Sequence, residues 1–139
     1  MHAKNIELRI LPLVKAINET GLFRTFSSCE GHFGHHDPDN FTDMENANVS
    51  FDPVEGISED RIESFFARVF ADHRNSQTKW EATLSICKYY VPSEEGRLPI
   101  QYHYRFEIHP FNPYESNEEK RRHVDILIEE VTNNVRRHS

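Results

Sequence analysis

Apolar and polar residues recur along this chain with two different periods, and the helical period comes first. Apolar residues three and four positions apart predict three helices, over 11–20, 58–70 and 116–135. Pro12 fits the first turn of the first helix, because its missing N–H would have no partner there. Ser58 and Ser116 are expected N-caps for the other two helices, since a serine hydroxyl accepts a bond from the first free backbone N–H groups.

The second period is the alternation of a strand. It predicts strands over 22–28, 47–52, 79–91 and 98–109. Alternation with one apolar side is typical of antiparallel sheets packed on one face. The order αββαββα therefore predicts one α+β domain over 1–139, a two-layer sandwich of a largely antiparallel sheet of about four strands with three helices on its apolar face.

The polar positions of the last two strands would gather on the other face of this sheet. Such a face either binds a ligand or joins two copies of the chain as a homodimer, and the pattern does not decide between them. The expected members of this face are Thr83, Ser85, Cys87, His103, Arg105 and Glu107.

Charge and composition limit the classes of function. A net charge of −7 over 139 residues disfavours nucleic acid as the main partner, because phosphate binding needs a concentrated basic face. No apolar run approaches the roughly 20 residues that a membrane span requires, so no membrane partner is expected. The N-terminal segment lacks a small-residue cleavage site, and two distant cysteines are no disulfide framework, so we expect a cytoplasmic protein.

Candidate chemistry is concentrated in the segment 25–40, TFSSCEGHFGHHDPDN. Its spacing C-x2-H-x2-H-H offers thiolate and imidazole, the ligands that zinc prefers, with acidic residues directly after them. The sequence therefore predicts a divalent metal site, zinc in the first place, whose further ligand is His103, His109 or water. In the alternative interpretation His35 and His36 are surface residues of a solvated turn. The candidate metal ligands are Cys29, His32, His35 and His36.

Cys29 also has two other interpretations. As a nucleophile or redox thiol it would be activated by His32 and by the backbone N–H groups of a turn containing Gly31. As a structural residue it would be a small buried hydrophobic side chain. The sequence leaves these alternatives open.

The last strand holds a third candidate group. His103, Arg105 and Glu107 share one face because they are two residues apart, so proton transfer and the binding of an anionic group are both available there. The alternative is an ion pair of Arg105 with Glu81 or Glu107. The pair Arg121 and Arg122 is interpreted as part of a solvated helix face.

The segment Ser27–His32, SSCEGH, resembles the Ser-Ser-Cys-Ser-Gly-Arg signature of the wybutosine-synthesis methyltransferase family, which modifies a tRNA guanosine with S-adenosylmethionine. It is also similar to an S-C-x-G-H motif of small bacterial and phage proteins of unknown function. The resemblance implies a loop that faces a ligand. The residues to which it applies are Ser27, Ser28, Cys29 and Gly31.

Two hypotheses for function follow. In the first, an enzyme acts on a small anionic substrate: Cys29 is ligand or nucleophile, His32 ligand or general base, His103 a second ligand or acid, and Arg105 the anion-binding residue. This requires the cysteine-histidine loop to fold over the polar side of the last two strands. In the second, a non-catalytic module docks a partner or dimerises through its polar sheet face.

Overall fold

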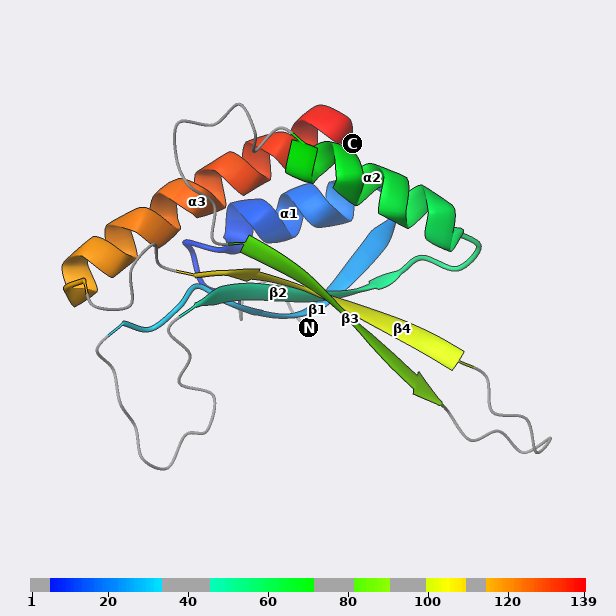
Figure 1. The fold of residues 1–139 in the computed structure, drawn as a ribbon, viewed down its shortest axis with the longest axis horizontal. Helices are drawn as coiled ribbons and strands as arrows, with labels where there is room; N and C mark the ends of the chain where they lie inside the picture. The colour runs from blue at the N-terminus through cyan, green and yellow to red at the C-terminus, as the bar shows by residue number, and fades with distance from the viewer. Residues whose placement is uncertain (1–5, 34–45, 72–81, 91–99, 110–114) are drawn as a thin grey trace.

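A computed structural model of the protein describes residues 6–33, 46–71, 82–90, 100–109 and 115–139 (Figure 1). The elements are α1 (Leu11–Glu19), β1 (Phe23–Cys29), β2 (Ala47–Pro53), α2 (Glu59–Ala71), β3 (Ala82–Tyr90), β4 (Ile100–Ile108) and α3 (Asn117–His138). The α+β class and the three helices that the sequence predicts are confirmed.

The sheet is antiparallel, as expected. β2 lies between β1 and β4, and β3 pairs with the far side of β4, which gives the order β1-β2-β4-β3. All three helices lie over the same side of this sheet (Figure 1). The polar side of the sheet is therefore the side away from the helices.

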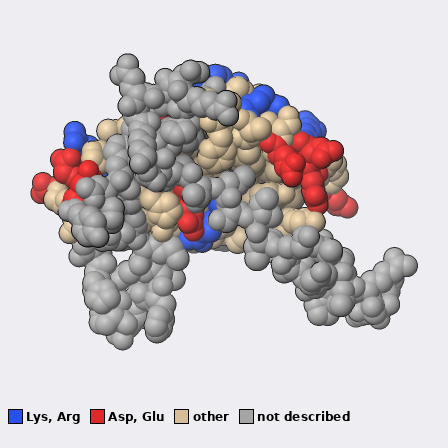
Figure 2. All heavy atoms as spheres, viewed as in Figure 1, with Lys and Arg blue, Asp and Glu red and all other residues tan. Residues whose placement is uncertain are grey.

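The helices begin where their local chemistry predicts. Pro12 lies in the first turn of α1, and the Ser116 hydroxyl accepts the backbone N–H of Glu119 at the start of α3. Two carboxylates, Glu59 and Asp60, complement the dipole at the start of α2, and Figure 2 shows acidic atoms gathered over this end of the helix. α3 continues to His138, past the predicted end, because basic side chains in its last turn favour that end of the dipole.

The core lies between the helices and the sheet, and aromatic rings fill its centre. Phe51 on β2 is fully buried, with its ring centroid 4.8 Å from that of Phe23, 5.7 Å from that of Phe66 and 5.9 Å from that of Tyr104. Strand β2 thus contributes the residue on which β1, β4 and α2 all pack.

Two features of the sheet depart from simple alternation. The pairing of β1 shifts between Thr25 and Ser27, and Phe26 at the shift is 42% exposed. On β2 the polar residues Asn48 and Ser50 are buried instead of solvated. Both belong to a central strand, so the side chains of β1 and β4 flank these short side chains on the sheet surface.

Candidate functional site

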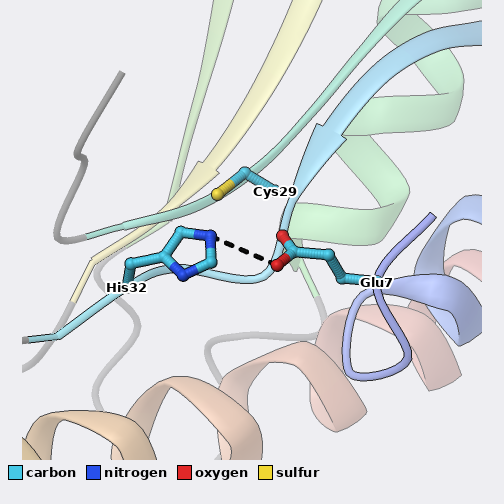
Figure 3. A group of neighbouring side chains, drawn as sticks. All are labelled: Glu7, Cys29 and His32. Carbon is cyan, nitrogen blue, oxygen red and sulfur yellow. Dashed lines mark ion pairs between the residues drawn. The ribbon is translucent and has the colours of Figure 1, made fainter. Parts of the chain in front are cut away.

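Three side chains from two separate segments converge at the end of β1. Cys29 is the last residue of β1, His32 follows three residues later, and Glu7 comes from the segment before α1. One ligand atom from each, the thiol sulfur, an imidazole nitrogen and a carboxylate oxygen, lies within 4.8 Å of the others. Figure 3 shows the His32 ring and the Glu7 carboxylate facing each other beside the Cys29 sulfur.

The Glu7 carboxylate joins the two segments. Its Oε2 lies 3.2 Å from Nε2 of His32, and its Oε1 accepts the backbone N–H of Glu30 at 3.0 Å. Both carboxylate oxygens thus bind the loop after β1, so Glu7 is held beside Cys29 although it precedes Cys29 by 22 positions in the sequence.

Gly31 shapes the turn that carries these residues. Its φ of +91° is one that side chains with a Cβ rarely adopt, and a Cβ there would lie 3.1 Å from the Phe33 ring and 3.3 Å from the backbone of Asn46. Its N–H donates to the Cys29 sulfur at 3.5 Å. Gly31 therefore lets the chain turn tightly enough to place Cys29 and His32 on one site.

The environment of Cys29 favours the neutral thiol in the metal-free protein. Burial raises the pKa of the Cys29 thiol above its ordinary value of 9.0, the charges of Glu7 and Glu30 raise it further, and the Gly31 N–H acts in the opposite direction. His32 pairs with Glu7 rather than activating the thiol. The geometry therefore favours Cys29 as a ligand over Cys29 as a standing thiolate, because a bound cation deprotonates a thiol.

Alkylation of Cys29 by iodoacetamide, in metal-free protein carrying Cys87→Ser, is expected to reach half its maximal rate above pH 9.0. A raised pKa leaves less thiolate at any given pH, so the reaction at neutral pH should be slower than that of a free cysteine. Glu7→Gln removes one of the charges that raise the pKa and should move the midpoint downward. A midpoint below 9.0 would show that the thiol is activated.

A layer of alternating charges surrounds the site. Arg9 lies 3.1 Å from Glu30 and 2.5 Å from Asp125, and Arg121 lies 2.6 Å from Asp125. Next to Glu7, Cys29 and His32 is a cleft of about 480 Å³. The residues lining it are Arg9, Glu30, Gly31, His32, Phe33, Asn117, Glu118 and Arg121.

Arg121 departs from the sequence interpretation. Its side chain is only 20% exposed, and its Nη1 donates to the Gly31 carbonyl at 2.8 Å. The neighbouring Arg122 is 62% exposed and does belong to a solvated face. Glu7 and Arg121 were both missed from the sequence, because no local spacing links either one to the loop after β1.

His103 and Arg105 lie apart from Cys29. Along the sheet Cys29 is opposite Asn48, and Asn48 is opposite Glu107. His103 is four residues further along β4, about 14 Å in strand length. The structure therefore does not bring His103 and Arg105 to the cysteine-histidine loop.

These β4 residues form their own contacts. His103 pairs through Nδ1 with Asp52, and its ring centroid lies 5.0 Å from that of Phe26. Arg105 Nε lies 2.7 Å from Glu107, which is one of the two ion pairs considered from the sequence.

The remaining residues predicted from the sequence do not join the group of Glu7, Cys29 and His32 among the described residues. Ser27 is exposed. Ser28 is paired with the core residue Val49, and within the described part of the chain its buried hydroxyl has no hydrogen-bond partner. His35 and His36 lie outside the described residues, so their role as ligands stays a prediction.

No helix among the described residues has the length and apolar character needed to cross a bilayer. Comparison with known proteins yields no matching family model, no matching curated protein and no matching solved structure.

Proposed function

We propose that this protein binds a divalent metal ion, zinc by preference, through Glu7, Cys29 and His32. The observation that carries the proposal is the convergence of one oxygen, one sulfur and one nitrogen donor within 4.8 Å. In a tetrahedral zinc site with bonds of 2.0 to 2.3 Å, ligand atoms lie about 3.5 Å apart, so only small side-chain movements are needed. Magnesium and calcium prefer oxygen ligands and would not use the thiol or the imidazole.

Three protein ligands are typical of a catalytic zinc site, in which water or substrate takes the fourth position. A metal bound here would supply a Lewis acid and an activated water. The cleft beside His32 supports a function of this kind, with a small substrate held against Phe33 and Arg9. The proposed framework is the two-layer, four-stranded sandwich inferred from the sequence, with the metal at the end of β1.

A second candidate is the interaction module that dimerises or docks a partner through the polar sheet face. The observation that favours it is Phe26, a large aromatic residue 42% exposed beside His103. Substituting Phe26→Ser would weaken self-association in this case and leave metal binding unchanged. Sedimentation velocity therefore distinguishes the two functions.

The metal proposal is tested by zinc titration of the untagged protein against a competing chromophoric chelator. The expected result is one zinc per chain with a Kd below about 1 μM. Elemental analysis of protein purified without chelator should show the same stoichiometry. Because the ion binds the folded state, zinc at about 100 times its Kd should add about 2.7 kcal/mol to the free energy of unfolding. Absence of stoichiometric binding in the titration would contradict the proposal.

A further inference from the structure

We propose that Arg121 is the positioning residue of the metal site, through which α3 holds the loop that carries Cys29 and His32. The inference rests on the proposed metal-binding function. It concerns a residue that contacts none of the three ligand atoms and acts through the backbone between them.

Two nitrogens of the Arg121 guanidinium form hydrogen bonds, and the third lies in an ion-pair contact. Nη1 donates to the carbonyl of Gly31 at 2.8 Å. Nε donates to Oδ1 of Asp125 at 2.9 Å, one turn along α3. Nη2 is buried and lies 2.6 Å from the same oxygen as an ion pair, without the geometry of a hydrogen bond. The guanidinium carbon lies 5.1 Å from the centroid of the Phe33 ring, within the range of a cation–π contact. Arg121 thus binds the residues on both sides of His32.

Ion pairs connect Arg121 to the segment that carries the third proposed ligand, Glu7. Asp125, which fixes the Arg121 fork, also binds Arg9, two residues after Glu7. Arg9 in turn binds Glu30, the residue directly after Cys29. Each segment that supplies a metal ligand therefore contacts the same network of alternating charges, and α3 is its common support.

The conformation of Gly31 explains why the contacts of Arg121 should affect the affinity for a metal. The positive φ of Gly31 determines where His32 lies relative to Cys29, and a glycine has little conformational preference of its own. The Arg121 bond to the Gly31 carbonyl fixes the peptide that follows that φ. Without it the ligands must be ordered when the ion binds, which lowers the affinity.

Positioning this loop requires a planar guanidinium group. Arginine can bind a carboxylate and a carbonyl in different directions while its face lies on an aromatic ring. Lysine keeps the charge but has a single nitrogen on a flexible stem. Arg121→Lys should therefore retain the local charge and lose the simultaneous contacts with Asp125, Gly31 and Phe33.

The experiment measures the zinc Kd of the full-length protein and of its Arg121→Ala, Arg121→Lys and Arg122→Ala variants. Groups outside the ligand set typically change metal affinity by about 10- to 100-fold, and both Arg121 variants should weaken zinc binding by an amount in this range. Arg122→Ala is the matched control, since Arg122 is adjacent, exposed and paired only with Glu119 at 2.6 Å among the described contacts. It should leave the Kd within about twofold.

Cobalt(II) gives a readout that general destabilisation would not change. In the folded Arg121 variants the thiolate-to-cobalt charge-transfer band should weaken and the visible bands should shift, because the ligand geometry is less fixed. Circular dichroism and thermal unfolding of the metal-free proteins establish that the fold is retained.

The possible outcomes separate this inference from the function on which it rests. Folded Arg121 variants with wild-type zinc affinity would overturn the positioning role and leave the metal site standing. If neither variant folds, Arg121 is a structural residue and the positioning role is also overturned. If the wild-type protein itself binds no zinc, the metal-binding function is contradicted, and this inference with it.

Discussion

Cys29→Ala is expected to reduce the affinity for zinc by more than about 100-fold while leaving the secondary structure intact. The substitution removes the donor that zinc binds most strongly in this group, and loss of a direct ligand should exceed the 10- to 100-fold effect of an indirect one. The side chain of Cys29 is only partly buried, so its loss should cost the metal-free protein little stability. The measurement is a chelator competition at neutral pH, with circular dichroism on the same samples.

The other two ligands provide an internal test of the same site. His32→Ala and Glu7→Gln should each weaken zinc binding as well. Glu7→Gln is the more informative of the two, because glutamine retains an oxygen that can accept the Glu30 N–H while losing the charge. Cys29 and Glu7 lie in different segments, so a joint effect requires the convergence that the structure describes.

Two control variants test the specificity of this effect. Cys87→Ala removes the other thiol of the chain, and His103→Ala removes an imidazole whose described partners are Asp52 and Phe26. Neither should change the zinc Kd. If His103→Ala weakened binding as much as Cys29→Ala, the metal would instead use the arrangement expected from the sequence, in which the loop folds over β4. Unchanged affinity in Cys29→Ala would contradict the proposed ligand set.

The parts of the fold that depend on local chemistry are readable from the sequence. Ser116 predicts the start of α3 because a cap satisfies N–H groups of its own first turn. Pro12 similarly belongs to the first turn of α1. The alternation of residues 47–52 predicts strand β2 itself. In each case the information lies within a few residues of the feature.

The candidate site was only partly predictable, because half of it depends on packing between distant segments. Cys29 and His32 stand out through their residue types and spacing. Glu7 and Arg121 do not, because an acidic residue before one helix and a basic residue in another are ordinary surface residues until the tertiary fold brings them to the same loop. The irregular pairing at Phe26 has the same origin, since the register of β1 is determined by its partner strand.

The polar face shows how a correct pattern can lead to an incomplete interpretation. His103 and Arg105 do share a face, as their spacing predicts. Their partners nevertheless include Asp52 and Glu107, and the strand separation keeps them from the cysteine-histidine loop. The two-residue repeat of side chains along a strand identifies the face on which each side chain lies. The distance between two sites on that face depends on strand order and register.

Phe51→Ala is expected to lower the free energy of unfolding by about 3 to 5 kcal/mol, the largest stability effect predicted for this chain. The ring is fully buried and contacts aromatic residues of β1, β4 and α2, so its removal leaves a cavity that rigid neighbours cannot fill. Since small domains have a total stability of about 5 to 15 kcal/mol, this is a large fraction of the whole. Urea unfolding followed by circular dichroism measures the change.

Phe26→Ala is the matched control for this core substitution, because it removes the same ring from the same sheet at an exposed position. It should cost about 1 kcal/mol or less, since its described ring contact is with His103 alone at 5.0 Å. Equal losses in the two variants would contradict the assignment of one sheet face to the core. Phe51→Ala also bears on the metal site, because β2 holds β1 and hence Cys29 in place. Zinc in excess should therefore restore part of the lost stability in Phe51→Ala, and this recovery should disappear when Cys29→Ala is added, because only the folded state binds the ion.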